Sequence, residues 1–257
     1  MNSESTSAGH LIPLDFDTVV GRANVFTDQN RLSTFGRLIL GEISRFDGQA
    51  RVLDVGCGNG LGVNQSAGVS ALSEIQMASG ELWGCEPDPD IVPSPLLNHF
   101  ARGTLEEAEL PDAHFDVIYA HYVVEHVADP KAFLAKAHRL LRPGGRLLFV
   151  TPNERHYFVK VARIVAALNL EEKVLGLINR EAAEAHYPTR YLLNDAPDIE
   201  RAGRETGFSQ SEFAYFEHGD IRSYAPRPLR WIPIGMEKLM QAGGYSRLPG
   251  LVARMRR

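Results

Sequence analysis

The chain has 257 residues, 44% of them hydrophobic and 23% charged, and no apolar run approaches the ~18 residues that a membrane span needs. Its formal net charge of −5 argues against a nucleic-acid binder, whose surface is normally basic. The two cysteines lack metal-ligand spacing around them, which predicts a reduced, cytoplasmic setting and no metal site.

The first residues are polar and predict a flexible amino-terminal tail over 1–27, followed by a single domain over 28–257. Apolar residues at helical spacing predict a helix within 29–46. They are Leu32, Phe35, Leu38, Ile39 and Ile43. A short apolar run over 51–56 then ends in glycine, as a buried parallel strand does. A helix over about 60–78 and a second strand over 81–86 are expected next.

The same alternation continues through the middle of the chain. Residues 99–102 give a third strand and residues 115–120 a fourth. Asp129 followed by Pro130 predicts a helix start, because aspartate caps helices and proline is tolerated in their first turn. A fifth strand is expected over 146–150. Strands that alternate with helices predict an α/β fold with a mostly parallel, doubly wound sheet.

The alternation breaks after the fifth strand. Two helices, over 157–168 and 171–184, are expected with no strand between them. We therefore predict a helical lid over about 154–192, above the carboxyl edge of the sheet, where doubly wound folds bind ligands. A helix over 196–206 and a strand within 208–218 resume the core.

Positive charge is concentrated near the carboxyl terminus. From Arg222 onward there are eight lysine and arginine residues and one acid, Glu237. Residues 227–240 mix arginines with large apolar side chains. Such a segment is either a core-packing helix with a solvated basic face, or one that lies at a membrane interface or binds an anionic substrate group. Peripheral membrane contact is kept as a hypothesis.

The glycine-rich segment 52–60 gives the strongest functional signal. Its glycines at 56, 58 and 60 let the backbone turn tightly and approach a ligand closely. The phosphate-binding pattern Gly-x-Gly-x-x-Gly is absent, because Leu61 stands at the sixth position counted from the first of these glycines.

Two carboxylates flank this loop. Asp54 precedes it, where a negative charge would repel a pyrophosphate but suits the ammonium and sulfonium groups of S-adenosylmethionine. Glu86 ends the second strand, where an acid can accept hydrogen bonds from both hydroxyls of a ribose. Taken alone, Glu86 is equally consistent with a solvated turn.

Residues 52–60 resemble the first motif of class I S-adenosylmethionine-dependent methyltransferases. Further segments resemble, in the same order, the small-molecule branch that includes ubiquinone/menaquinone-biosynthesis-like and polysaccharide-cluster-like enzymes: 103–107, 110–111, 115–116, 125–127, 139–145 and 151–153. The resemblance covers about residues 50–153. It implies methyl transfer and a Rossmann-like seven-stranded sheet whose last strand, assigned to 251–254, runs antiparallel.

The resemblance also implies which residues contact the cofactor. They are Asp54, Gly56, Cys57 and Gly58 around the methionine part, Glu86 at the ribose, Thr104 and Leu105 beside the adenine, and Ala120 and His121 beside the methyl group. Many relatives carry an aspartate at the position of Thr104, which bonds the adenine amino group. Glu106 is a candidate substitute for that contact.

Methyl transfer to oxygen usually needs a base, and histidine is the natural candidate. We expect His186, near the end of the lid, ahead of His126, which has an alternative structural role in tying the loop after the fourth strand. The acceptor is expected to be a small molecule, a sugar or a lipid-linked intermediate and not nucleic acid, because the Asn/Asp-Pro-Pro-Tyr pattern of amino-methylating DNA enzymes is missing. The oligomeric state is not predicted.

Two other interpretations remain open. An NAD(P)-dependent oxidoreductase on a similar fold is disfavoured by the missing phosphate-binding pattern and by the lack of a Tyr-x-x-x-Lys pair, since Lys160 follows Tyr157 one position too early. A non-catalytic relative that binds only the cofactor or a partner protein is not excluded by an intact cofactor site.

Overall fold

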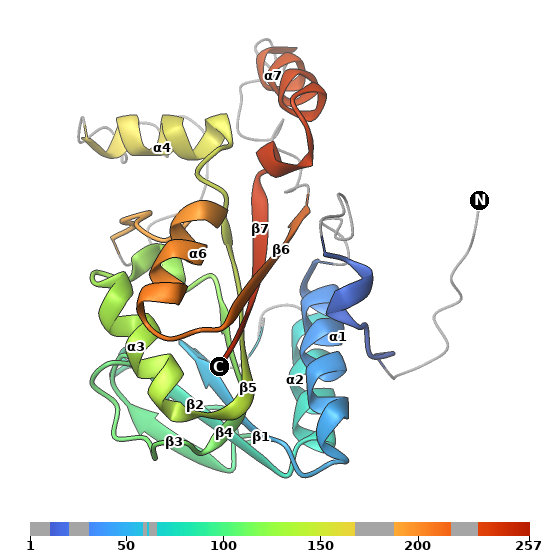
Figure 1. The fold of residues 1–257 in the computed structure, drawn as a ribbon, viewed down its shortest axis with the longest axis vertical. Coiled ribbons are helices and arrows are strands. Elements are labelled where there is room, and N and C mark those ends of the chain that lie inside the picture. Colours follow the sequence, from blue (N-terminus) through green and yellow to red (C-terminus); the bar gives the residue numbers. More distant parts are fainter. Residues whose placement is uncertain (1–10, 21–30, 59–60, 62–65, 168–187, 217–230) are drawn as a thin grey trace.

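The computed structural model describes residues 11–20, 31–58, 61, 66–167, 188–216 and 231–257. Within them, seven strands form one sheet with the order β3-β2-β1-β4-β5-β7-β6 (Figure 1). Their bounds are β1 (Arg51–Val55), β2 (Glu81–Glu86), β3 (His99–Arg102), β4 (Phe115–His121), β5 (Leu141–Pro152), β6 (Gln210–Phe216) and β7 (Gly250–Arg256).

Strand direction agrees with the prediction of a mostly parallel sheet. All pairs from β3 to β5 are parallel, and β7 is antiparallel to both of its neighbours, β5 and β6. The predicted antiparallel last strand is therefore confirmed, over a longer range than 251–254. Because the strand order reverses between β1 and β4, their carboxyl ends flank the crevice in which such sheets bind ligands.

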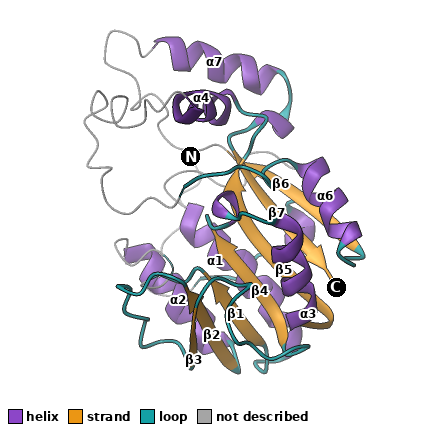
Figure 2. Cartoon of the chain, turned by 90° about the vertical axis from the view of Figure 1, so that its left-hand side faces the viewer, coloured by secondary structure: helices purple, strands orange, loops and turns teal. Residues whose placement is uncertain are grey.

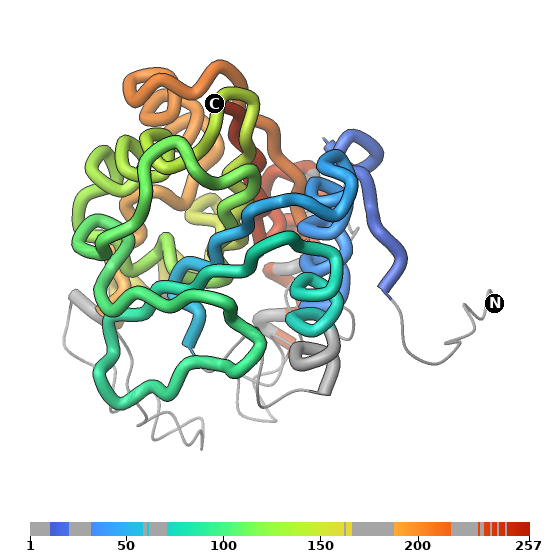
Figure 3. Tube along the Cα trace, turned by 90° about the horizontal axis from the view of Figure 1, so that it is seen from below, coloured from blue at the N-terminus to red at the C-terminus, as the bar shows by residue number. Residues whose placement is uncertain are grey.

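Helices cover both faces of the sheet. On one face lie α1 (Arg31–Ile43) and α2 (Ser66–Ala78), and on the other lie α3 (Pro130–Leu140) and α6 (Ala196–Glu205), as Figure 3 shows from below. The period-2 alternation of β4 serves both layers: Val117 and Tyr119 belong to the apolar cluster with α1 and α2, whereas Ile118 and Ala120 belong to the cluster with α3 and α6.

The predicted start of α3 is confirmed in atomic detail. Asp129 Oδ1 accepts hydrogen bonds from the backbone N–H groups of Lys131 and Ala132, both at 3.0 Å, and Pro130 occupies the first turn. These contacts satisfy amides that have no partner inside the helix.

Two further helices lie at the carboxyl edge of the sheet, α4 (Tyr157–Ala167) and α7 (Trp231–Ala242) (Figure 2). α4 confirms the first helix expected in the insertion, and the second, over 171–184, lies outside the described residues. α7 leaves Trp231 and Leu239 exposed to 69% and 61%, and none of its side chains that the structure describes is buried. None of the described helices combines the length and apolarity needed to cross a bilayer.

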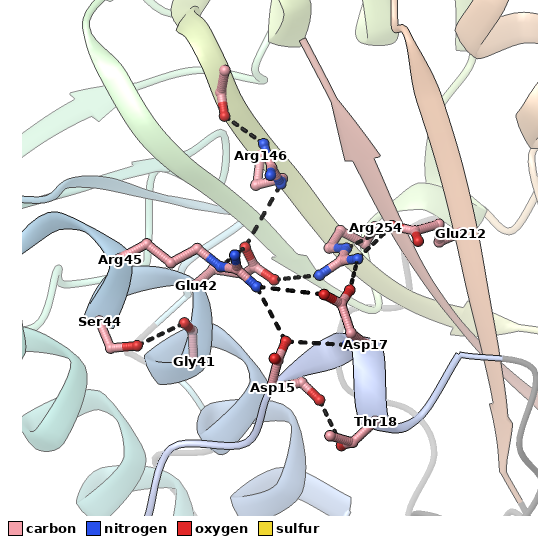
Figure 4. A network of polar contacts seen from close by, with 11 residues as sticks. Asp15, Asp17, Thr18, Gly41, Glu42, Ser44, Arg45, Arg146, Glu212 and Arg254 are labelled. Carbon is pink, nitrogen blue, oxygen red and sulfur yellow. Dashed lines mark hydrogen bonds and ion pairs between the residues drawn. The ribbon is translucent and has the colours of Figure 1, made fainter.

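Residues 11–20, which fall within the expected tail, pack against the domain. Phe16 in the short helical turn Phe16–Thr18 is fully buried. Beside it, the buried Arg254 of β7 pairs with Asp17, with Glu42 of α1 at 2.8 Å and with Glu212 of β6 at 2.5 Å (Figure 4). Part of the carboxyl-terminal positive charge is thus neutralised inside the fold. The division into a tail and one domain with a lid stays a prediction.

Candidate cofactor and active site

The glycine loop leaves β1 with its backbone in the left-handed region. Gly56 and Gly58 have φ angles of +63° and +51°, which side chains rarely adopt. A Cβ at Gly56 would lie 2.5 Å from Val123 Cγ2, whereas a Cβ at Gly58 would have no described atom within 4 Å. The first glycine therefore permits close packing against the turn after β4, and the second borders space that no described residue fills.

Hydrogen bonds fix this loop to the end of β2. The backbone N–H groups of Gly56 and Cys57 donate to the carbonyl of Cys85 at 2.8 and 3.1 Å. Both cysteines are buried free thiols, and burial raises the pKa of Cys85 to about 12 and that of Cys57 even further. Neither thiol is therefore ionised near neutral pH, and both act as small packing residues.

Asp54 lies at the end of β1, before the loop, and its carboxyl forms no ion pair with a described residue. It is 2% exposed, and its Oδ2 has no hydrogen-bond partner among the described residues. Burial, with the negative charge of Glu86 adding to it, raises its pKa to about 8. A hydrogen bond with the Tyr119 hydroxyl lowers the pKa and offsets part of this shift. A buried carboxyl of this kind is stabilised in its ionised form when a cation binds beside it.

Glu86 joins the end of β2 to the glycine loop. Its Oε2 accepts a hydrogen bond from the Gly58 N–H at 2.9 Å, and its Oε1 accepts one from the Asp88 N–H at 3.0 Å. The side chain is only 5% exposed, so the solvated-turn interpretation is wrong. Each carboxylate oxygen has a second lone pair, so these contacts leave room for ribose hydroxyls as further donors.

Thr104 and Leu105, which we expect beside the adenine, make contacts within the protein. Thr104 is engaged by Glu107, whose Oε2 accepts from its N–H at 3.2 Å and from its hydroxyl at 3.0 Å. Leu105 is 2% exposed and belongs to the core. The charge of Glu106 contributes to the raised pKa of Cys85. Contacts of these residues with adenine stay a prediction.

The end of β4 lies beside α1. Ala120 is fully buried between Val55 of β1 and Phe149 of β5. His121 follows with its ring 5.7 Å from Phe35 of α1. Tyr122 then has a φ angle of +56°, which is unusual for a tyrosine and turns the chain sharply away from the strand.

A buried carboxyl that we did not single out from the sequence helps to hold residues 190–194 against the sheet. Glu125 Oε2 accepts from the Thr151 hydroxyl at 3.3 Å, and Asn194 Nδ2 donates to that hydroxyl at 2.6 Å. The Glu125 carbonyl accepts the N–H groups of Arg190 and Tyr191 at 2.7 and 3.1 Å. Burial raises the pKa of Glu125 to about 7. An acid inside the apolar run after β4 was the signal available in the sequence.

The two predicted catalytic histidines differ in what the structure shows. His126 lies in the turn Val124–His126, with Nδ1 3.4 Å from the Pro188 carbonyl, a contact that fits the structural role of tying the loop. His186 lies outside the described residues. A third histidine, His156, is fully buried after β5 and accepts a hydrogen bond from the Phe158 N–H at its Nδ1.

These features meet at one edge of the sheet. The ends of β1 and β2 offer two buried carboxyls and a loop of bare backbone, and the end of β4 offers a buried alanine and an aromatic wall. The Asp54 carboxyl has no described ion-pair partner, and no described atom fills the space beside Gly58. Both features fit a cationic nucleoside such as S-adenosylmethionine. They do not fit the pyrophosphate of a dinucleotide, which the two carboxyls would repel.

The chain matches a family model described as a methyltransferase domain over residues 29–210. Among curated proteins, it is 35% identical over 106 residues to a probable S-adenosylmethionine-dependent methyltransferase of Mycolicibacterium smegmatis, covering 40% of this chain and 38% of that protein. It is 36% identical over 112 residues to a ubiquinone biosynthesis O-methyltransferase of Cereibacter sphaeroides, covering 40% and 41%. These matches thus span about two fifths of each relative.

A longer match links the chain to the 27-O-demethylrifamycin SV methyltransferase of Amycolatopsis mediterranei, 26% identical over 205 residues and covering 69% of this chain and 73% of that protein. Among solved structures, an S-adenosylmethionine-dependent methyltransferase from Mesorhizobium loti has a TM-score of 0.51 at 17% identity, covering 88% of this chain and 97% of that one. At this identity the structural similarity establishes the fold alone.

Proposed function

Because the chain belongs to the methyltransferase domain family, whose model covers residues 29–210, we propose that it transfers the methyl group of S-adenosylmethionine to a small-molecule acceptor. The observation that supports this most is the buried Asp54 carboxyl beside the glycine loop, which forms no ion pair with a described residue and whose Oδ2 accepts no hydrogen bond from one. A cationic ligand is the group that such a carboxyl stabilises.

Each strand end supplies a different part of the proposed binding site. Asp54 and the loop residues Gly56, Cys57 and Gly58 hold the positively charged methionine part, and Glu86 accepts hydrogen bonds from the ribose. The segment 104–106 lies beside the adenine, and Ala120 and His121 form the floor of the site.

When bound, the cofactor supplies a methyl group on a sulfonium, which is already electrophilic. The chain's own task is then to align the acceptor, exclude water and take up a proton. The lid predicted over 154–192 is proposed to exclude water from the site. Glu125 holds its returning end on the sheet through the Arg190 and Tyr191 amides. Proton uptake by His186, or by His126 as the second choice, stays a prediction.

The acceptor is proposed to be a small molecule, a sugar or a lipid-linked intermediate. One relative is named a ubiquinone biosynthesis O-methyltransferase and another a 27-O-demethylrifamycin SV methyltransferase, and both names support an oxygen acceptor here. Peripheral membrane contact through 227–240 and the cytoplasmic setting also stay predictions, and residues 227–230 lie outside the described part of the chain.

Calorimetric titration with S-adenosylhomocysteine and, separately, with NADH tests the proposed activity class. We expect S-adenosylhomocysteine to bind with micromolar affinity and NADH to give no heat of binding. Binding of NADH in preference to S-adenosylhomocysteine would instead support the oxidoreductase interpretation. If neither ligand binds to folded protein, the assignment of Asp54 and Glu86 to the cofactor is wrong.

A further inference from the structure

A basic pocket lies between the two helices at the carboxyl edge of the sheet. Its volume is about 340 Å³, and the described residues that line it are Arg155, Lys160, Met240 and Arg247. They come from the turn after β5, from α4, from α7 and from the short helical turn Tyr245–Arg247. This size is typical of a small-ligand site.

The pocket shares its edge of the sheet with the candidate cofactor site. β7 begins at Gly250, which pairs with Pro152 at the end of β5, so the turns that carry Arg155 and Arg247 meet above these strands. Figures 1 and 2 both show α4 and α7 at this end of the molecule. Asp54 lies at the same edge, two strands away from β5 in the sheet order.

The three cationic side chains are held differently. Arg155 is fixed by Asp195, with Nε 2.7 Å from Oδ1 and Nη2 3.3 Å from Oδ2, and these hydrogen bonds raise its pKa. Lys160 and Arg247 are exposed, and within the described part of the chain neither forms an ion pair. Among the residues that the structure describes, one carboxylate stands against three cations, which leaves an excess of two positive charges at the pocket.

The Arg247 side chain packs against the backbone of Gly243. Gly243 ends the turn after α7, and a Cβ there would lie 2.5 Å from Nη1 and 2.8 Å from Cζ of Arg247. The guanidinium therefore occupies the space that a side chain at position 243 would take. A side chain at this point would move Arg247 without changing the charge of the chain.

We infer that this pocket binds the phosphate or diphosphate group of a phosphorylated ligand. A phosphate carries a charge close to −2 near neutral pH, which matches the excess charge, and arginine and lysine are its usual partners. A monocarboxylate would leave one cation unbalanced. That the ligand is the methyl acceptor rests on the proposed function, whereas the anion site itself does not.

Apolar side chains exposed on the same two helices bear on the source of the phosphate. Val161 and Ile164 of α4 are 52% and 60% exposed, and Leu239 of α7 is 61% exposed. A ligand with an apolar chain attached to its phosphate would cover them, whereas a soluble phosphorylated ligand would not. The two sources share the same phosphate chemistry in the pocket, and an experiment with two arms separates them.

The first arm titrates inorganic pyrophosphate into the full chain by calorimetry. The second measures co-sedimentation with phosphatidylcholine vesicles, with and without phosphatidic acid. In both arms the wild type is compared with Lys160→Ala/Arg247→Ala and with Lys131→Ala/Arg204→Ala, which loses the same charge from exposed sites on α3 and α6. S-Adenosylhomocysteine affinity is measured for all three proteins.

We expect the pocket variant to weaken anion binding about tenfold or more, the scale of lost charged hydrogen bonds, and the control to bind like the wild type. Gly243→Ala should also weaken binding at unchanged net charge, which a general electrostatic effect does not predict. Binding in the pyrophosphate arm alone identifies a soluble ligand, and phosphatidic-acid-dependent sedimentation identifies a lipid-linked one.

The inference is overturned if neither probe binds, or if the pocket variant loses no more affinity than the control. If the wild type binds the anion but not S-adenosylhomocysteine, the proposed function is contradicted and the anion site is not. Unchanged S-adenosylhomocysteine affinity in the pocket variant shows that this protein is folded.

Discussion

Replacing Asp54 with asparagine is expected to raise stability and lower cofactor affinity. Burial, with the charge of Glu86 adding to it, raises the pKa of Asp54 from 3.8 to about 8. Between these values the folded protein keeps a proton that the unfolded chain loses. The stability that this proton contributes is complete below about pH 4 and is lost as the pH rises through about 8.

The size of the effect follows from the pKa. At about 1.36 kcal/mol per pKa unit, ionising this carboxyl in the folded protein costs roughly 6 kcal/mol relative to the unfolded chain. Asparagine keeps the shape and cannot ionise, but a buried amide without a partner costs about 1–3 kcal/mol. We therefore expect Asp54→Asn to raise the free energy of unfolding at about pH 9 by roughly 3–5 kcal/mol.

Urea denaturation at about pH 9 measures the stability, and calorimetry with S-adenosylhomocysteine measures the affinity, which should fall by about 1–3 kcal/mol. Asp116→Asn is the matched control. Asp116 is also buried, but it pairs with Arg142 at 2.9 Å and accepts the Arg51 N–H at 2.9 Å. The control should lose stability and keep its affinity. The reasoning is refuted if Asp54→Asn is destabilised like the control and binds the ligand like the wild type.

Three other perturbations test separate features. Because burial raises the pKa of Glu125 to about 7, its contribution to stability is lost as the pH rises through 7, and Glu125→Gln should flatten the fall of the unfolding free energy between about pH 5 and 8, measured in urea. Gly56→Ala should lower the melting temperature more than Gly48→Ala, since both glycines have positive φ but only the first would place a Cβ against Val123; equal losses would contradict the packing argument. Arg254→Met should cost about 3–5 kcal/mol in chemical denaturation, because it breaks the ion pair with the buried Glu42 together with those to Asp17 and Glu212, and a neutral result would mean that the network is not stabilising.

Much of the fold was predictable because its signals are local. The apolar run of β1, the cap of α3 at Asp129 and the spacing of Phe35 and Leu38 in α1 each act over a few residues, and the structure agrees with them. β3 was the weakest signal of the sheet, because an edge strand that is half exposed along its length has no buried face to enforce alternation.

The parts that could not be predicted depend on distant residues. Arg254 meets Glu42 across 212 positions of sequence, so its charge could not be recognised as internal. The antiparallel direction of β7 carries Arg254 and Arg256 away from the edge where Arg247 lies, and the carboxyl-terminal basic residues are therefore not a single patch. Glu125 stands within an apolar run of the sequence, but its hydrogen bond with Thr151, 26 positions away, depends on the pairing of distant segments.

The place of β7 also constrains how the molecule is assembled. It follows every other described strand in the chain, yet it lies between β5 and β6, so those two strands cannot join a common sheet until residues 250–256 are available. A nascent or truncated chain that stops before Gly250 would expose two unpaired strand edges and lack the arginine that Asp17 and Glu42 require. Such fragments should aggregate, and completion of this sheet should be a late, non-local step of folding.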